Sequence, residues 1–455
     1  MKIALISTYE LGRQPFGLAS PAAWLRKRGH EVRCVDVSRK PLDEETVREA
    51  EMIGFYVPMH TAARMTVQCI EPLRHMNPKA HFCVFGLYAR MNEAVFRKAG
   101  VGSVLGAEFE EQLAKLADEV SRYASNGKRS DGKGDGTIPR LKFEIPDRKG
   151  LPSLKKYAHL VLPNGEHRTT GYTEASRGCK HLCRHCPIVP VYRGVFRVVQ
   201  PEVVLADIRQ QVKAGAKHIT FGDPDFFNGI KHAMRIVEAL HKEFPKLTYD
   251  ATIKIEHLRK HKGHLGRLRE TGCLLVTSAV ESLDDDVLKK LEKGHTRADF
   301  LEVLKDCRHE GLALQPTFVP FTPWTTIEKY LELLETLREC ELEESVAPIQ
   351  LGIRLLIPAG SRLLELGEIQ KICGPFEEGA LVHPWRHEDG RIDTLAAEVQ
   401  EIVAAGERRK ETRREIFARI RQAARKNAEE REELDSRALL ADRATVPYLN
   451  EPWYC

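Results

Sequence analysis

Three cysteines in one short loop constrain this chain more than any other feature. Cys179, Cys183 and Cys186 follow one another at the spacing CxxxCxxC. A four-iron, four-sulfur cluster usually takes four thiolates, so a loop with three leaves one iron open to a substrate or cofactor. Zinc is the alternative, because His181 or His185 could complete a set of four ligands. Structural zinc sites usually consist of two separated ligand pairs, so the crowding of these ligands in one loop favours the iron–sulfur cluster.

The residues around these cysteines match a known pattern. Gly178 stands directly before Cys179, where it would let the backbone approach a cluster closely, and His185 precedes the last cysteine. The loop resembles the signature of the radical S-adenosylmethionine (radical SAM) enzymes, in which an aromatic residue commonly precedes that cysteine. The resemblance implies a [4Fe-4S] cluster held by Cys179, Cys183 and Cys186, with S-adenosyl-L-methionine on the open iron. It also implies a one-electron donor such as flavodoxin or ferredoxin, and a small-molecule or peptide substrate.

Composition fits a large intracellular enzyme. The chain has 455 residues, of which 42% are hydrophobic, so two or three domains are expected. Its eleven cysteines are mostly scattered singles, and the odd number argues against a disulfide framework and for a reducing cytoplasm. The sequence has no apolar run near the roughly 18 residues that span a bilayer, which argues against a membrane partner. A net charge of +5 is too small to indicate nucleic acid by itself.

Residues 1–125 are predicted to form an open, doubly wound (Rossmann-like) α/β domain, in which strand-like runs alternate with helical stretches. This order resembles the cobalamin-binding-like domain at the front of one large radical SAM subclass. The sequence lacks the DxHxxG signature that supplies a lower axial histidine, although some radical SAM relatives hold cobalamin without it. Cobalamin therefore stays an open alternative, and His60 is interpreted as a polar loop residue. The expected strands are residues 2–7, 31–37, 52–57, 80–85 and 101–105.

A polar stretch at residues 126–143 is predicted to be a flexible linker, and residues 144–166 a connecting strap. From residue 167 to 390, six β-then-α units predict a partial (β/α)6 barrel of the radical SAM type. The functional loops of such a barrel lie at the carboxyl ends of its strands, and the cysteine loop follows the first strand. The expected strands are residues 167–174, 218–221, 248–255, 273–278, 312–319 and 349–357.

The second strand is followed by Gly222, Asp223 and Asp225, where the radical SAM family often has Gly-Gly-Glu. The resemblance implies that this segment meets the methionine amino group of S-adenosyl-L-methionine. Only Gly222 matches literally, and either carboxylate could approach the ammonium. A turn and helix cap is the alternative interpretation, because Asp and Pro suit both.

Further candidate cofactor contacts follow the later strands. Glu256 lies at the end of the third strand, and Glu281 and Ser282 resemble the Val-Glu-Ser segment of cobalamin-type radical SAM enzymes. There they would meet the ribose or the amino acid part of the cofactor. Arg354 is a charge inside an apolar run and needs an anion, either the cofactor carboxylate or a structural ion pair. Tyr172 is among the candidates for contact with the substrate.

The chain is predicted to end in a helical extension, residues 391–445, and a tail, residues 446–455. The extension is rich in Arg, Lys and Glu, but the opposite charges nearly balance and no aromatic residues interleave, which argues against nucleic acid. The tail and the block 179–198 resemble the radical SAM proteins named for a Cys-Cys-Ala-Glu-Pro or Cys-selenocysteine-Ala-Glu-Pro (CCAEP or CUAEP) tail. Cys455 is the first cysteine of such a tail, as expected if a selenocysteine codon was read as a stop. The resemblance implies a catalytic thiol at Cys455, and an idle thiol is the alternative.

The sequence thus predicts a radical SAM enzyme that acts on an unidentified small-molecule or peptide substrate. A cobalamin-dependent radical SAM methyltransferase is one alternative. A non-catalytic iron–sulfur or zinc protein is an alternative of a different class.

Overall fold

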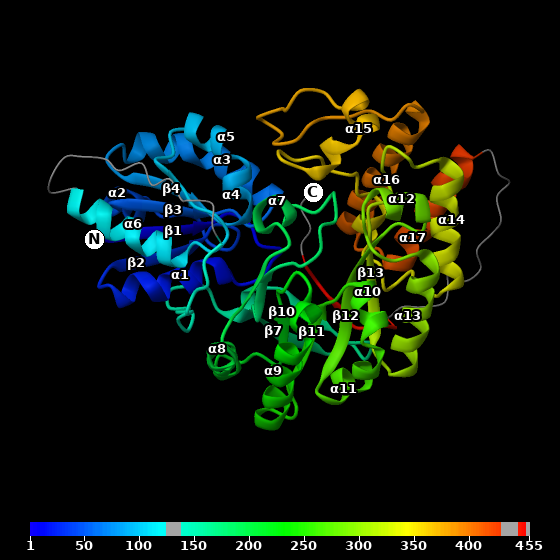
Figure 1. Ribbon diagram of the computed structural model, residues 1–455, viewed down its shortest axis with the longest axis horizontal. Helices are drawn as coiled ribbons and strands as arrows, with labels where there is room; N and C mark the ends of the chain where they lie inside the picture. The colour runs from blue at the N-terminus through cyan, green and yellow to red at the C-terminus, as the bar shows by residue number, and fades with distance from the viewer. Residues whose placement is uncertain (124–137, 429–444, 452–455) are drawn as a thin grey trace.

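The structure is a computed structural model that describes residues 1–123, 138–428 and 445–451. Two α/β parts lie side by side, and helices near the C-terminus pack against the outer side of the second part (Figure 1). The N-terminal part is blue to cyan in Figure 1, and the barrel is mainly green. The architecture confirms the predicted fold class.

The N-terminal sheet is parallel throughout and has the strand order β2-β1-β3-β4-β5. Its connections reverse direction between β1 and β3, which makes the carboxyl ends of these two strands the switch point of a doubly wound sheet. The strands are short apolar runs buried by helices on both faces. In chain order, the elements are β1 (Lys2–Ser7), α1 (Phe16–Lys27), β2 (Glu31–Asp36), α2 (Glu44–Glu49), β3 (Met52–Tyr56), α3 (His60–Met76), β4 (His81–Phe85), α4 (Leu87–Met91), α5 (Glu93–Lys98), β5 (Ser103–Val104) and α6 (Glu110–Tyr123).

The second sheet has the order β13-β12-β11-β10-β7-β6-β14. Five strands, β7 to β13 in this order, are parallel and form the half-barrel, while β6 and β14 pair antiparallel at one edge. The strands are β6 (His159–Val161), β7 (His167–Thr173), β10 (His218–Phe221), β11 (Thr248–Thr252), β12 (Cys273–Glu281), β13 (Ala313–Phe318) and β14 (Tyr448–Leu449). The helices that follow them are α8 (Pro201–Lys213), α9 (Ile230–Glu243), α10 (Ile255–Lys260), α11 (Leu265–Glu270), α12 (Asp285–Lys290), α13 (Arg297–His309) and α14 (Ile327–Glu339).

The sixth expected barrel strand, residues 349–357, is not a strand in the structure. A short 3-10 helix, Pro348–Leu351, takes its first half, and only a parallel bridge between Phe321 and Arg354 continues the sheet. Of this run, Leu356 is 46% exposed, whereas Leu351, Leu355 and Ile357 are 3% exposed or less. Their apolar run predicted burial correctly, but it could not distinguish a strand from an irregular buried segment.

The expected linker is only partly described, because residues 124–137 lie outside the described residues. Its end is not a linker: Phe143 is buried in the barrel core, and Arg197 donates to the carbonyl oxygen of Pro139 at 2.9 Å. The strap that follows ties the two parts together. Arg148 donates to Asp207 of α8 at 2.8 Å and to Gln14 of the N-terminal part at 2.7 Å.

Helices α15 (Gly367–Ile372), α16 (Gly390–Arg409) and α17 (Arg413–Asn427) follow the barrel. The apolar faces of α16 and α17 pack against each other and complete the barrel core, with Val399 and Ile420 fully buried. Residues 429–444 of the expected helical extension lie outside the described residues.

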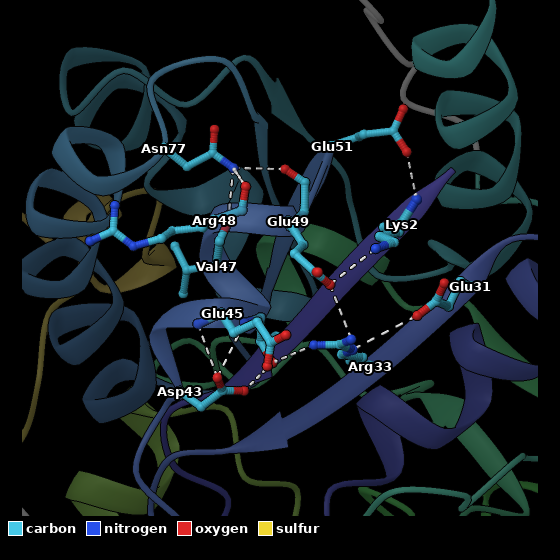
Figure 2. Close-up of polar contacts among 12 residues, drawn as sticks. Lys2, Glu31, Arg33, Asp43, Glu45, Val47, Arg48, Glu49, Glu51 and Asn77 are labelled. Atoms are coloured by element: carbon cyan, nitrogen blue, oxygen red, sulfur yellow. Dashed lines mark hydrogen bonds and ion pairs between the residues drawn. The ribbon is translucent and has the colours of Figure 1, made fainter.

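Asn77 fixes the position of α2 on the N-terminal sheet (Figure 2). Its Nδ2 donates to the carbonyl oxygens of Val47 and Ala50, each at 2.8 Å, and its Oδ1 accepts from the amide of Ala80 at 3.1 Å. On the other side of α2, Glu49 pairs with Lys2 and Arg33, each at 3.1 Å, but these groups are half-exposed and contribute little. The buried side-chain amide is therefore the stronger tie.

We expect Asn77→Ala to destabilise the N-terminal part by about 2 kcal/mol, because it leaves buried backbone groups without partners. Hydrogen exchange of the amides of β1 and β3 measures this local free energy of unfolding. Glu45→Ala, an exposed change on the same helix, is the control and should stay within about 0.5 kcal/mol of the parent chain. Equal exchange rates in both variants would contradict the assignment.

Candidate functional site

The cysteine loop is held by a two-stranded hairpin at the mouth of the half-barrel. Strand β8 (Ser176–Gly178) leads into the loop and pairs antiparallel with β9 (Phe196–Val198) behind it. Gly178 has φ +73°, and a Cβ there would lie 2.4 Å from the ring of Tyr192 and from the carbonyl oxygen of Val195. Only a glycine fits at this position, because the atoms that a Cβ would meet belong to Tyr192 and Val195. The reason expected from the sequence was different, a close approach of the backbone to a cluster.

The three thiols of the loop lie in a largely buried setting with two lysines nearby. Cys179 and Cys183 are buried and Cys186 is half-buried, and all three are free. Burial raises the pKa of Cys186 to about 12, which disfavours a bare thiolate. Lys254 Nζ lies 3.8 Å from Cys183 Sγ. Burial opposes the charge of Lys293, but Glu281 and then the thiolate charges of Cys183 and Cys186 outweigh it and raise the pKa of Lys293. Two lysine ammonium groups thus offset thiolate charge, and this donor set suits a cluster.

A second grouping at the same place bears on the zinc alternative. Ligand atoms of Cys179, His181 and Asp225 all lie within 4.8 Å of one another. Zinc accepts this mixture of thiolate, imidazole and carboxylate. The grouping leaves out Cys183 and Cys186, whereas a cluster would use all three thiols. Metal analysis of the purified protein distinguishes a zinc site from an iron–sulfur cluster.

The structure gives the two aspartates after β10 different roles. Asp223 is turned toward the start of the cysteine loop, where its carboxylate accepts from the amide of Ala175 at 2.9 Å and from Ser176 Oγ at 2.5 Å. Burial outweighs these hydrogen bonds and raises the pKa of Asp223 to about 7. A Cβ on Gly222 would lie 1.9 Å from the Tyr172 hydroxyl oxygen, so only glycine fits there.

Asp225 lies beside the cysteine loop. Its Oδ1 accepts from the amide of Phe227, as the cap interpretation requires, while Oδ2 lies 2.7 Å from His257 Nδ1 and 3.7 Å from His181 Nε2. The side chain is fully buried. Of the two aspartates, Asp225 is the one placed to meet a ligand on the loop.

Glu256 and Glu281 lie on either side of the loop. Glu256 is half-exposed and lies 3.4 Å from both His181 Nδ1 and Lys254 Nζ. Glu281 ends β12 with φ +70°, and its carboxylate lies 3.1 Å from His185 Nε2 and 3.3 Å from Lys293 Nζ. Burial opposes ionisation, but Lys293 and His185 outweigh it and hold the pKa of Glu281 at about 2. The residue is therefore an ionised acceptor at neutral pH.

Ser282 and Arg354 have structural partners. Ser282 Oγ accepts from the amide of Asp284 at 3.0 Å, at the start of the turn into α12. Arg354 pairs with Asp393 of α16 at 2.6 Å, and its guanidinium lies 3.7 Å from the centre of the Trp385 ring. Asp393 is therefore the anion that Arg354 was expected to need. Of the two interpretations that the sequence left open, the structure has the ion pair within the protein.

Lys254 and Lys293 were not predicted as site residues, and His181 and His185 were considered as ligands only of the alternative zinc site. Lys254, Lys293 and His185 belong to segments that the sequence singles out for their neighbours, Glu256, Glu281 and Cys186. A lysine next to an expected ligand is a usable signal, because buried thiolates need compensating cations. Its contact with a particular thiol depends on the barrel bringing separate strands together.

Cys455 lies outside the described residues, but the segment before it is described. Strand β14 pairs with β6, and Gln315 on β13, at the opposite edge of the sheet, donates to the carbonyl oxygen of Pro447 at 2.8 Å. Glu451 is buried and forms an ion pair with Arg13 of the N-terminal part, with Nε donating at 2.8 Å. The tail therefore bridges the open side of the half-barrel.

A cavity of about 210 Å³ lies between the switch point of the N-terminal sheet and the cysteine loop. Tyr56 and Phe109 form its N-terminal wall, and Tyr172 and Gly178 belong to its barrel wall. A corrinoid is much larger than this cavity. His60, the one histidine weighed as a corrin ligand, bonds the carbonyl oxygen of Ala380 at 2.7 Å. A second cavity, of about 360 Å³, lies between the same two parts and is lined by Gly106 and Arg193 among others, and cobalamin stays a possible cofactor.

Comparison with known proteins gives the same picture. A family profile described as the radical SAM superfamily matches residues 173–334. Ribosomal protein uS12 methylthiotransferase RimO of Geobacter sulfurreducens is 22% identical over 278 residues, which cover 57% of this chain and 60% of the relative. The chain thus spans less than two thirds of that relative's length.

None of the described helices is both long and apolar enough to cross a bilayer.

Two solved structures share the fold. The cobalamin-dependent S-adenosylmethionine radical enzyme OxsB, with aqua-cobalamin and S-adenosylmethionine bound, gives a TM-score of 0.68 at 14% identity over 89% of this chain and 66% of its own. The radical S-adenosylmethionine methyltransferase TsrM from Kitasatospora setae, with tryptophan and a SAM analogue bound, gives 0.58 at 16% identity over 81% and 76%. Likeness at these identities establishes the fold.

The raised pKa of Asp223 predicts a pH-dependent stability. The folded state holds its proton up to about pH 7, whereas the unfolded chain releases it near pH 4, so this contribution is lost as pH rises between these values. Asp223→Asn keeps the shape without the ionisation. We expect the melting temperature of the variant, relative to the parent chain, to be higher at pH 7.5 than at pH 5. A difference that does not change with pH would contradict the raised pKa.

Proposed function

We propose that this chain is a radical SAM enzyme that binds a [4Fe-4S] cluster through Cys179, Cys183 and Cys186, as the superfamily profile over residues 173–334 supports. With that cluster it would cleave S-adenosyl-L-methionine reductively and start radical chemistry on a small-molecule or peptide substrate. The observation that carries the proposal is the convergence of three free thiols and two lysines, Lys254 and Lys293, at the mouth of a half-barrel.

The chain's own residues would bind and orient the reactants. The chemistry that such a cluster supplies when bound is one-electron cleavage of a sulfur–carbon bond of S-adenosyl-L-methionine. Asp225, Glu256 and Glu281 place three carboxylates around the loop and suit the ammonium and hydroxyl groups of that cofactor. Gly222 and Asp223 would act on the cofactor only through the backbone, because Asp223 holds the cysteine loop. Ser282 and Arg354 are expected to support the site without contacting the cofactor.

Two alternatives are kept for testing. The cobalamin-dependent methyltransferase draws on the likeness to OxsB and TsrM and on the two cavities between the two parts of the chain. A non-catalytic metal protein draws on the grouping of Cys179, His181 and Asp225. We place the reaction in a reducing cytoplasm with a flavodoxin- or ferredoxin-like electron donor, because the ten cysteines of the described residues are all free.

The finer assignment is to the CUAEP or CCAEP group of radical SAM proteins, with Cys455 acting at the active site. It is supported by the position of Glu451, whose partner Arg13 lines the same cavity as Gly178. The described tail thus approaches the cavity beside the cysteine loop. A thiol there could donate hydrogen or hold a product.

Anaerobic reconstitution tests the main proposal. We expect about four irons per chain, as for a [4Fe-4S] cluster, and an electron paramagnetic resonance signal of the reduced protein that changes when S-adenosyl-L-methionine is added. Reduction should release 5′-deoxyadenosine or another cleavage product. Cys183→Ala should lose the iron and the turnover, whereas Cys340→Ala, a half-buried thiol outside the loop, should keep both. Zinc instead of iron, or full turnover without Cys183, would defeat the proposal, and a corrinoid absorption band would favour the methyltransferase.

The tail proposal has a separate test. Alkylation of each thiol by iodoacetamide can be followed by mass spectrometry in the reconstituted enzyme. We expect S-adenosyl-L-methionine to slow alkylation of Cys455 several-fold, because the cofactor would cover the thiol at the active site. Cys69, a half-buried thiol on α3, should react at an unchanged rate. If Cys455 also reacts at an unchanged rate, it does not act beside the cofactor.

A further inference from the structure

The cavity at the switch point contains an acidic side chain without a partner. Glu10 follows β1 and is 6% exposed. Its Oε2 has no hydrogen-bond partner among the described residues. The neighbouring buried acids differ: Glu110 and Glu174 each lie 2.6 Å from a nitrogen of Arg177, and Glu451 pairs with Arg13. Glu108 also has an unpartnered oxygen, but it lies 3.8 Å from Arg177, whereas no ion pair is described for Glu10.

The surroundings increase the cost of that unmatched charge. Burial first, and then the charges of Glu174 and Asp36, raise the pKa of Glu10 well above its ordinary value. Arg13 and Arg148 act in the opposite direction, but both are already paired, with Glu451 and Asp207. A buried carboxylate of this kind is costly unless a cation or donor meets it. The acids of this region therefore outnumber its arginines, and among the described residues Glu10 forms no ion pair with them.

Aromatic rings form the rest of the wall. Tyr56, Phe109 and Tyr172 all line the cavity, and aromatic faces attract cations. Arg177 already lies 5.5 Å from the centre of the Phe109 ring, and Arg13 lies 5.1 Å from that of Tyr172. No cation is described over Tyr56 among the residues of the structure. The Tyr56 ring is packed against Gly17, where a Cβ would lie 2.2 Å from it, so the Glu10 carboxylate is the group of this cavity that an ammonium could meet.

Position and size point to a substrate. The cavity lies outside the carboxyl ends of β1 and β3, where doubly wound sheets bind ligands, and its far wall includes Gly178, next to Cys179. Its volume of about 210 Å³ suits a molecule smaller than those that fill drug-sized pockets of roughly 300 Å³ and more. A ligand bound there lies beside the cysteine loop.

We propose that this cavity binds the substrate by a positively charged nitrogen, which pairs with the Glu10 carboxylate. The substrate is then a small amine. The inference rests on the proposed function, because the adjoining cluster loop is what makes a ligand in this cavity a substrate.

The test uses the reconstituted full-length chain and two matched probes, n-butylamine and 1-butanol, whose binding is measured by saturation-transfer NMR. We expect the amine to bind more tightly than the alcohol. Glu10→Gln should weaken amine binding about tenfold, the loss expected for one charge-assisted hydrogen bond. Glu45→Gln, an exposed change in the same part, should bind the amine like the parent chain.

Stability distinguishes a binding role from a structural one. Glu10→Gln removes an unmatched buried charge, so its melting temperature should equal or exceed that of the parent chain. A lower melting temperature, equal binding of the two probes, or unchanged amine binding by Glu10→Gln would overturn the inference. Release of 5′-deoxyadenosine from the same samples without an amine tests the proposed function separately, so either proposal can fail alone.

Discussion

The buried ion pair between Arg177 and Glu110 joins the two parts of the molecule at the point where the cysteine loop begins. Two guanidinium nitrogens of Arg177 donate to the Glu110 carboxylate at 2.9 and 2.6 Å, and a third donates to Glu174 at 2.6 Å. The guanidinium also lies 4.9 Å from the centre of the Phe143 ring. Removal of one partner from such a buried group typically costs about 3–5 kcal/mol. Since Gly178 and Cys179 follow directly, helix α6 of the N-terminal part holds the first residues of the loop.

The fold could be read from the sequence because its apolar runs are short and well separated. Each of the five parallel strands of the N-terminal sheet overlaps an expected run, and so do the five parallel strands of the half-barrel. The sixth barrel strand was predicted wrongly because Leu351, Leu355 and Ile357 are buried in an irregular segment, and their apolar character alone could not exclude a strand. The end of the expected linker failed because one aromatic residue, Phe143, is enough to anchor a polar segment in a core.

The site was less predictable, since its chemistry depends on contacts between distant segments. Spacing alone revealed the three cysteines, but it could not show that Lys254 would approach Cys183, or that Lys293 would pair with Glu281. The sequence could not distinguish the roles of Asp223 and Asp225. In the structure the side chain of Asp223 supports the start of the cysteine loop, whereas that of Asp225 lies beside the loop. The sequence offered two candidate anions for Arg354. Its partner in the structure is Asp393, which lies on α16, a helix that begins at residue 390.

The contact between Arg13 and Glu451 joins residues 438 positions apart in the chain. Contacts of such long sequence separation form late, because the intervening chain must be ordered first. During synthesis the N-terminal part and the parallel strands can fold domain by domain, while the edge that β14 will occupy is still unpaired. The edge of β6 in the nascent half-barrel therefore stays unpaired until the segment that holds β14 has been synthesised.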